Sequence, residues 1–131
     1  MAAGAVQRDA DTAEFFAGTE RGELLLRCCG SCGQLSRPQA RSCGQCRSAD
    51  LSWAPAAGQG AVISWAVVHG RAAGGQPPTR TVIAIVELDE GPWLHSRLAG
   101  VSPDSVSGGL RVTVGFERAE GGEAIPVFRP A

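Results

Sequence analysis

The sequence predicts a mainly β protein in which a short N-terminal helix and a zinc ribbon precede a five-stranded OB-fold barrel. Three observations lead to this prediction. Two Cys-x-x-Cys pairs lie close together early in the chain, five apolar segments of strand length fill the second half, and a run rich in Pro, Ala and Gly separates them. We expect a flexible N-terminus and short helix over 1–18, the zinc ribbon over 19–52, and the OB-fold over 53–131.

The composition limits the classes of function. A chain of 131 residues fits one domain, or one small domain plus a metal-stapled module. Its net charge of −1 provides no overall basic field that would attract nucleic acid. No apolar run approaches the ~20 residues of a membrane span, and charged residues interrupt 1–17 where a signal peptide would be apolar. We therefore expect a soluble cytoplasmic protein without a membrane partner.

The first expected element is a short helix that begins at Asp11 or Thr12. Thr12 is a suitable N-cap, and Gly18 is expected to end the helix. Two adjacent phenylalanines, Phe15 and Phe16, cannot both face one core on so short a helix. We expect one ring to pack under the ribbon and the other to cover a neighbouring surface; alternatively, the exposed ring docks onto a partner protein.

The strongest motif consists of Cys29, Cys32, Cys43 and Cys46, two Cys-x-x-Cys pairs with ten residues between them. Such pairs form two knuckles that deliver four thiolates to one Zn²⁺. A disulfide framework would need an oxidising compartment, and a redox pair would accompany a βαβ pattern. A catalytic zinc usually keeps an open position beside His or carboxylate ligands. We predict a structural zinc site, with Cys28 as a bystander.

The ribbon segment is expected to contain a strand over 23–27 that enters the first knuckle and a connection over 35–41 between the knuckles. It carries more arginines than acids, which is typical of a solvated face; a site for phosphate groups is the alternative. The turn-rich run over 54–60 is taken as the boundary of the ribbon.

The second half of the chain reads as five strands, with a mobile loop over 70–79 and a short helical turn or irregular crossing over 101–109. Both faces of the first strand are expected to be at least partly buried. Five short strands with an excursion between the third and fourth suit a closed barrel of the OB type, although the pattern does not fix the strand order. The strands are expected at 61–69, 80–88, 93–99, 110–118 and 124–128.

Few residues suit catalysis by the chain alone. His69 and His95 are the only imidazoles, and a lone strand histidine is more typical of a hydrogen-bonded structural residue than of a general base. Asp89 and Glu90 lie in a turn, where solvated carboxylates are usual. The sequence contains no Gly-rich phosphate loop or nucleophile elbow. We therefore do not expect a stand-alone enzyme.

Binding of single-stranded nucleic acid is an alternative, since OB-folds and ribbons both do it. Such proteins combine a basic groove with exposed aromatic rings. The barrel segment has fewer arginines than acids, which argues against this class, although Trp93 beside a turn could serve as a stacking platform.

Several segments together resemble the DUF35 family, over roughly residues 12–130. They are the Phe-Phe helix, 22–27 (GELLLR) before the knuckles, Arg37-Pro38 between them, 60–62 (GAV) at the start of the barrel, 86–91 (VELDEG) and 126–130 (PVFRP). Members of that family join an N-terminal helix and a rubredoxin-like zinc ribbon to a C-terminal OB-fold. One departure is that the family usually shows a single Cys after the Arg, whereas Arg27 here precedes Cys28-Cys29.

The resemblance implies a role in acyl-CoA metabolism. Family members are typically accessory subunits that bind thiolase-like enzymes, including steroid side-chain aldolases, and help to accommodate the CoA thioester. We therefore expect a non-catalytic subunit of a thiolase-like or aldolase partner, in a reaction such as steroid side-chain retro-aldol cleavage, with acyl-CoA near the interface. A stand-alone acyl-CoA-handling enzyme, such as a thioesterase, is the other alternative. The candidate contact residues are Phe15, Phe16, Arg37, His69 and Trp93.

Overall fold

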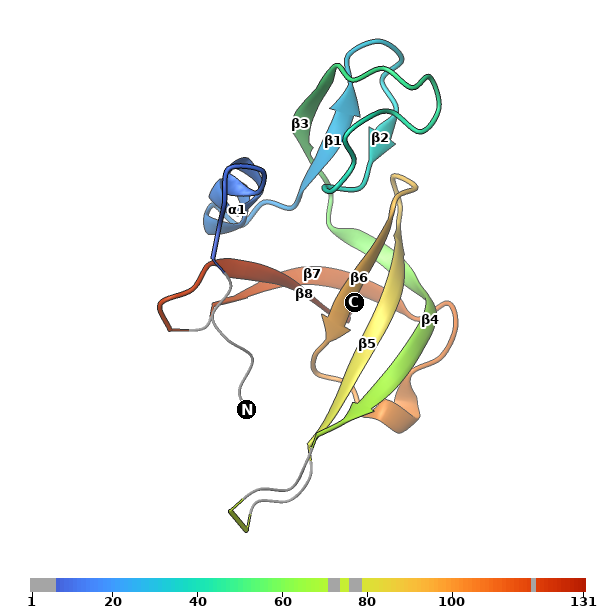
Figure 1. Ribbon diagram of the computed structural model, residues 1–131. Helices are drawn as coiled ribbons and strands as arrows, with labels where there is room; N and C mark the ends of the chain where they lie inside the picture. The colour runs from blue at the N-terminus through green and yellow to red at the C-terminus, as the bar shows by residue number, and fades with distance from the viewer. Residues whose placement is uncertain (1–6, 71–73, 76–78, 119) are drawn as a thin grey trace.

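A small three-stranded sheet, one helix and a closed β-barrel make up the computed structural model, which describes residues 7–70, 74–75, 79–118 and 120–131 (Figure 1). The fold class expected from the sequence is confirmed. The elements in chain order are α1 (Ala13–Glu20), β1 (Leu25–Cys29), β2 (Leu35–Ser36), β3 (Leu51–Pro55), β4 (Gln59–His69), β5 (Arg80–Leu88), β6 (Trp93–Leu98), the 3₁₀ turn η1 (Pro103–Ser105), β7 (Arg111–Arg118) and β8 (Ala124–Pro130).

The ribbon sheet has the antiparallel order β2-β1-β3. Strand β3 pairs with β1 from Cys29↔Leu51 to Leu25↔Pro55, so the turn-rich connection expected over 54–60 is shorter than predicted. Pro55 is tolerated because it ends an edge strand, where its missing N–H is not needed by a neighbour. The expected boundary at residue 53 falls inside β3, and the limits of the domains stay predictions.

The barrel closes in the order β4-β5-β6-β8-β7, with β4 pairing back to β7. All five expected strands are present, and β5 has the predicted limits. Strands β6 and β8 pair in parallel at Leu98↔Phe128, a crossing made possible by the excursion that carries η1. The pairing of β4 with β5 shifts between Val62 and Ser64, where a bulge interrupts the register.

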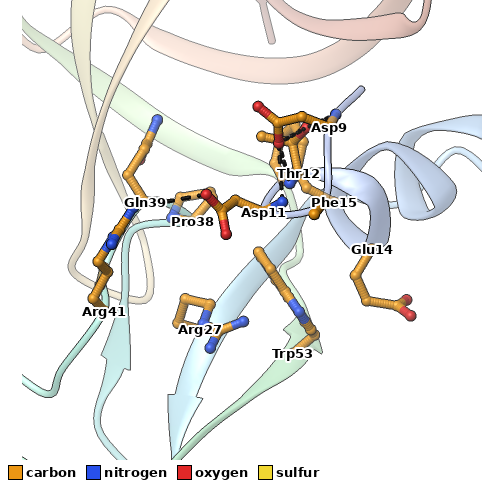
Figure 2. A pocket seen from close by; sticks show the side chains of 12 residues that line it. Asp9, Asp11, Thr12, Glu14, Phe15, Arg27, Pro38, Gln39, Arg41 and Trp53 are labelled. Atoms are coloured by element: carbon orange, nitrogen blue, oxygen red, sulfur yellow. Dashed lines mark hydrogen bonds and ion pairs between the residues drawn. The ribbon is translucent and has the colours of Figure 1, made fainter. Parts of the chain in front are cut away.

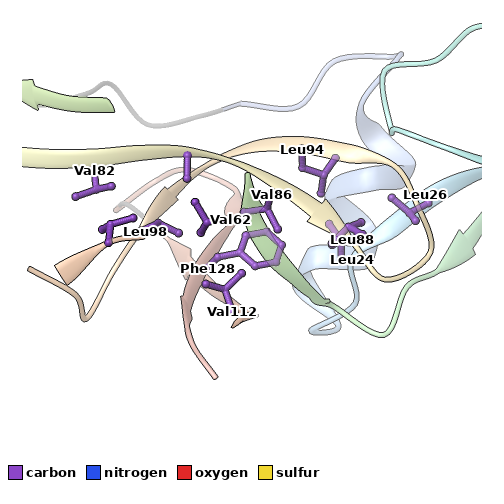
Figure 3. Packing of buried hydrophobic residues seen from close by; sticks show 12 residues of the cluster. Leu24, Leu26, Val62, Val82, Val86, Leu88, Leu94, Leu98, Val112 and Phe128 are labelled. Atoms are coloured by element: carbon purple, nitrogen blue, oxygen red, sulfur yellow. The ribbon is translucent and has the colours of Figure 1, made fainter. Parts of the chain in front are cut away.

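One hydrophobic core joins the barrel to the ribbon (Figure 3). Leu24 and Leu26, on the segment that leads into and begins β1, are 1% and 0% exposed and belong to the same buried cluster as Leu88 and Phe128 of the barrel. The pairing of β1 with β3 extends one residue beyond Leu25↔Pro55 to this segment, because the N–H of Ala56 donates to the carbonyl of Leu24 at 2.8 Å. Leu24 and Leu26 therefore link the ribbon to the core of the barrel.

Helix α1 runs through Gly18, so the prediction that Gly18 ends the helix is wrong. A Cβ on Gly18 would lie 2.6 Å from the side chain of Leu25, which shows that the glycine allows a close approach of helix and strand. Thr12 makes no side-chain cap bond; the carboxylate of Asp9 instead accepts from the Thr12 N–H at 2.9 Å. No helix in the described part of the chain is long and apolar enough to cross a bilayer.

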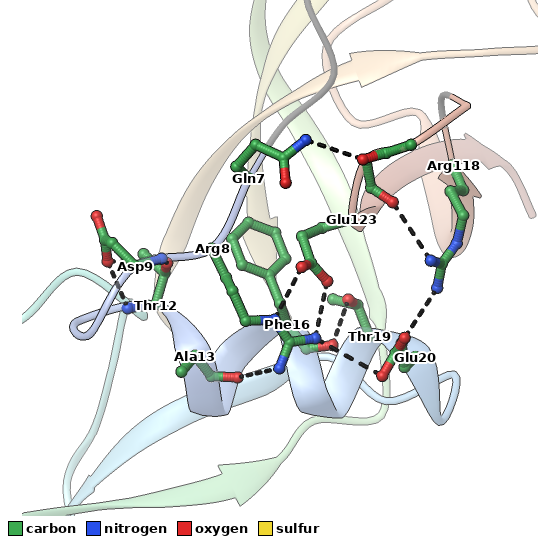
Figure 4. Close-up of polar contacts among 12 residues, drawn as sticks. Gln7, Arg8, Asp9, Thr12, Ala13, Phe16, Thr19, Glu20, Arg118 and Glu123 are labelled. Carbon is green, nitrogen blue, oxygen red and sulfur yellow. Dashed lines mark hydrogen bonds and ion pairs between the residues drawn. The ribbon is translucent and has the colours of Figure 1, made fainter.

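A polar network ties α1 and the segment before it to the β7–β8 hairpin (Figure 4). Arg8 donates through Nε and Nη2 to the two carboxylate oxygens of Glu123, both at 2.8 Å. Glu20 accepts from Arg118 at 3.2 Å and lies 3.6 Å from Arg8. The flexible N-terminus expected from the sequence is thus held at Arg8, while residues 1–6 lie outside the described residues.

The outer half of β4 departs from the prediction that both of its faces are partly buried. Trp65 and Val68 are 41% and 52% exposed. The reason is that β4 pairs with β7 only at Gln59, Gly60 and Ala61, and then runs on alongside β5. Most of the loop expected to be mobile over 70–79 lies outside the described residues.

Candidate metal centre and neighbouring grooves

Two knuckles of the same backbone design hold the predicted cysteines. In each, the residue four positions after the first cysteine donates its N–H to that cysteine's carbonyl at 2.9 Å: Gly33 to Cys29, and Arg47 to Cys43. Both donors have a left-handed backbone, with φ of 78° at Gly33 and 65° at Arg47. This conformation costs little for glycine and more for arginine, so the second knuckle keeps its shape against a local preference.

The knuckles bring four sulfur atoms together. The Sγ atoms of Cys29, Cys32, Cys43 and Cys46 all lie within 4.8 Å of one another, and the Cys29–Cys46 and Cys32–Cys43 pairs are 3.5 Å apart. Sulfurs around a tetrahedral Zn²⁺ with bonds of ~2.3 Å lie roughly 3.8 Å apart. The four thiols therefore fit a metal ion and could hold one. Among the described residues, this group does not include Cys28, which precedes Cys29 on β1.

Backbone N–H groups favour the ionised form of the first cysteine in each knuckle. The N–H groups of Cys32 and Ser31 lower the pKa of Cys29 to about 6, despite the opposing effect of desolvation. The equivalent N–H groups of the second knuckle lower the pKa of Cys43. The second cysteines behave differently: although the backbone N–H of Gln34 opposes it, the hydrogen bond to Cys43 and burial raise the pKa of Cys32 to about 12, and the pKa of Cys46 is raised as well. Each knuckle therefore offers one thiol that ionises readily and one that a metal ion would have to deprotonate on binding.

Three of the five predicted contact residues line one groove of about 470 Å³ between the ribbon, α1 and the barrel: Phe15, Arg37 and Trp93. Trp93 is 57% exposed, and its indole N–H donates to Glu87 at 2.9 Å. Phe16 is buried on the inner side of α1. Its ring packs edge to face against that of Phe15, with the two ring centroids 5.3 Å apart. Phe15 is thus the phenylalanine that reaches the surface.

The structure does not bring the two histidines together. His95 lies on β6 and lines the same groove as Trp93. His69 ends β4, opposite Arg80 of β5, away from the groove-lining residues. A site that used both imidazoles on one substrate would need an arrangement other than this one.

A second groove, of about 700 Å³, is also lined by Phe15 (Figure 2). Arg27 stacks over the ring of Trp53 at 4.3 Å, and Phe15 lies 6.5 Å from the same ring. Arg27 also donates through Nη2 to the carbonyl of Leu51 at 3.3 Å. Acidic side chains line another wall: Asp9, Asp11 and Glu14.

The pairing of Arg27 with Trp53 was not predicted from the sequence. The two residues are direct cross-strand partners on β1 and β3. Apolar Leu51 and Trp53 alternate with polar or small residues over 51–55, which is a strand pattern. Pro55 and the alanines around it favoured a turn instead, so β3 was not predicted.

Comparison with known proteins identifies the family. The family described as "ChsH2, C-terminal OB-fold domain" matches residues 53–117. A solved structure named "Ltp2-ChsH2(DUF35) aldolase" is similar over 94% of this chain and 96% of that one, with 32% identity and a TM-score of 0.80. The chain belongs to the DUF35 family. A DUF35 protein of unknown function from Sulfolobus solfataricus shares the fold at 14% identity, with a TM-score of 0.62.

Relatives of this DUF35 chain carry two kinds of name. A probable enoyl-CoA hydratase alpha subunit of Thermomonospora curvata is 34% identical over 92% of the chain and 38% of its own length. A DUF35 domain-containing scaffold protein of Methanocaldococcus jannaschii is 30% identical over 69% of the chain and 64% of its own length. A 3-oxo-4,17-pregnadiene-20-carboxyl-CoA hydratase alpha subunit of Mycobacterium tuberculosis is 33% identical over 78% of the chain and 32% of its own length. The DUF35 chain therefore spans less than two thirds of each of these relatives.

Proposed function

We propose that this chain is a non-catalytic accessory subunit that binds and supports a thiolase-fold enzyme acting on acyl-CoA thioesters. The observation that carries the proposal is the similarity to the Ltp2-ChsH2(DUF35) aldolase structure along nearly the whole length of both chains. The scaffold name of one relative supports a supporting role, and the hydratase names support acyl-CoA chemistry. Retro-aldol cleavage of a steroid side chain is the reaction we assign to the partner.

The metal assigned to the four cysteines is Zn²⁺ in a structural role. Four thiolates complete its tetrahedral shell, so no position is left at which substrate would bind. Because the binding free energy of such a site is also folding free energy, the ion would hold the ribbon in shape. The ligands we assign are Cys29, Cys32, Cys43 and Cys46.

The partner surface we assign is the groove that Phe15, Arg37 and Trp93 line. An exposed tryptophan beside an apolar wall and an arginine is the composition in which binding hot spots are found. Phe16 would contribute indirectly, by supporting the ring of Phe15 from below. Acyl-CoA would lie near this interface, bound chiefly by the partner, while His69 at the end of β4 would contact the partner only if its surface extended that far.

The test is co-expression with a thiolase-like enzyme from the same organism. We expect the two proteins to purify together, and Trp93→Ala to weaken the complex at least tenfold. The matched control is Trp65→Ala, which removes another exposed tryptophan outside the groove. A partner enzyme that is equally soluble and active without this chain would refute the accessory role.

The hydratase alpha-subunit names favour one other candidate, catalysis on acyl-CoA by this chain itself. The purified chain would then turn over acyl-CoA substrates, measured as free thiol or as hydrated product. Turnover lost in His95→Ala, which removes the groove imidazole, would favour this candidate. Turnover retained in that variant and in His69→Ala would exclude either histidine as the base.

Nucleic-acid binding receives little support from the surface around Trp93. Its indole is bonded to the carboxylate of Glu87, which would repel a phosphate backbone. Fluorescence titration with oligonucleotides at two salt concentrations tests this directly. Tight binding that weakens with salt would favour the nucleic-acid alternative over the accessory role.

A further inference from the structure

The outer edge of β4 carries backbone groups without a strand partner among the described residues. Pairing with β7 ends at Ala61, after which Val62 still exchanges bonds with the loop before β7, at 3.0 Å from its N–H and 2.8 Å to its carbonyl. The bulge between Val62 and Ser64 follows at once and increases the local twist. Beyond it, the outer half of β4 continues along β5, which pairs on its other side with β6 as far as Val82 (Figure 1). In this arm of the sheet, the open edge among the described residues is that of β4.

The register of this arm identifies which backbone groups face outward. The N–H of Gly70 donates to the carbonyl of Thr79 at 2.7 Å, across from β4 to the β5 side. In an antiparallel pair, hydrogen-bonded positions alternate along a strand. Residues 64, 66 and 68 therefore direct their N–H and C=O groups to β5. The backbone groups of Trp65, Val67 and His69 point to the outer edge.

Beyond the bulge at its start, this edge has none of the side-chain protections that exposed strands usually carry. Edge strands avoid pairing through charged residues, proline or short length. Residues 63–68 (ISWAVV) contain no charged residue, no proline and no glycine. Ile63, Trp65 and Val68 are 38%, 41% and 52% exposed. Such an edge is a template for another β-strand.

We propose that the outer edge of β4 pairs with the same edge of a second copy of this chain. A two-fold axis at Val67 places Val67 opposite its own copy and Trp65 opposite His69 of the other subunit. The same axis places His69 opposite Trp65 of the other subunit, which makes three pairs in all. The two residues of each pair exchange two backbone hydrogen bonds. The contact is isologous, as expected of a symmetric dimer.

The side chains are compatible with this register on both faces. On one face Val67 meets its copy, and the ring of Trp65 lies beside the imidazole of the opposite His69. On the other face Ala66 lies opposite Val68, so small apolar side chains meet. Because residues 63–68 are uncharged, the two-fold brings no like charges face to face along that stretch. A strand of unrelated sequence would not necessarily place compatible side chains on both faces of β4, which favours a second copy as the partner.

The first test measures the mass of the purified, metal-loaded chain by light scattering and by sedimentation over the micromolar range. We expect a dimer whose dissociation constant rises at least tenfold in Ala66→Lys. Ala66 is exposed, so this variant should fold, and the two-fold would bring the two lysines to diagonal positions across the new strand pair. Thr81→Lys, one strand inward, is the matched control that adds the same charge away from the edge.

A second measurement tests the register. In hydrogen-bonded antiparallel pairs the Cα atoms lie about 5.5 Å apart, within the range of a disulfide. Oxidised Val67→Cys should therefore form a covalent dimer, whereas Trp65→Cys, which faces residue 69 of the other subunit, should not.

The proposal goes beyond the accessory function, since the mass measurement uses no partner enzyme. A chain that stays monomeric at every concentration would overturn it, as would a dimer that is unchanged by Ala66→Lys. If the chain is monomeric and Ala66→Lys instead releases the partner enzyme, the edge belongs to a strand of that enzyme, and self-pairing is refuted while the accessory role stands.

Discussion

Replacing Leu24 by alanine tests whether the ribbon and the barrel form one cooperative unit. Leu24 is 1% exposed and precedes β1, yet it packs in the cluster that contains Leu88 and Phe128 of the barrel. If the two parts share a core, a truncation on the ribbon side should destabilise both. If they are independent, it should affect only the ribbon.

The size of the effect follows from burial. Truncation of a fully buried leucine removes its transfer free energy and leaves a cavity, for a total of roughly 3 kcal/mol. In a protein of this length, 1 kcal/mol lowers the midpoint of thermal unfolding by about 3–4 °C. We therefore expect Leu24→Ala to lower the midpoint by roughly 10 °C while the metal content is unchanged.

The assay is differential scanning calorimetry of the metal-loaded chain, with Leu51→Ala as the control. Leu51 lies on β3 of the same ribbon sheet, is half-buried and is not part of the shared cluster, so the same truncation should cost clearly less. Two separate transitions in the unmodified chain, with only one of them moved by Leu24→Ala, would refute the shared core. So would equal shifts for the two variants.

Further predictions concern the metal site and the N-terminal network. Cys43→Ser should lose the metal and Cys28→Ser should keep it, because Cys43 is one of the four grouped cysteines and Cys28 is not. Inductively coupled plasma mass spectrometry measures the metal content of each variant. Because the pKa of Cys29 is about 6, metal binding at pH 7.5 should release fewer protons than four neutral thiols would, measured by calorimetry in buffers of different ionisation enthalpy. In the folded state, the hydrogen bond from Arg8 lowers the pKa of Glu123 below its ordinary value of 4.5. The ionised Glu123 carboxylate therefore stabilises the fold above pH 4.5, and this stabilisation is lost as the pH falls through the lowered pKa. The difference in unfolding midpoint between the unmodified chain and Glu123→Gln should therefore shrink on acidification, and a constant difference would contradict this.

The parts of the fold that the sequence predicted well are those in which the local pattern and the tertiary environment agree. Strand β5 has alternating apolar residues that the barrel core buries on one side, and its limits match the prediction. The cysteine spacing likewise determines the knuckles locally, because each hydrogen-bonded loop closes within five residues.

The errors occurred where a distant neighbour decides the outcome. Gly18 reads as a helix stop, but its role depends on Leu25, which packs where a Cβ would lie. Trp65 reads as buried because its strand is apolar, yet its exposure depends on how soon β7 diverges from β4. The groove at Trp93 is assembled from the ribbon, the helix and three barrel strands, and no single segment contains the information that they meet.

Strand β1 links two parts of the molecule within a few residues. Leu26 is fully buried in the barrel core, and three residues later Cys29 contributes a sulfur to the metal group. A change in the width of the barrel would therefore move a ligand of the metal through a single short strand. The visible absorption of Co²⁺ depends on the geometry of its ligands. In a cobalt-substituted chain, a change in this absorption would therefore report binding of a ligand or partner to the barrel.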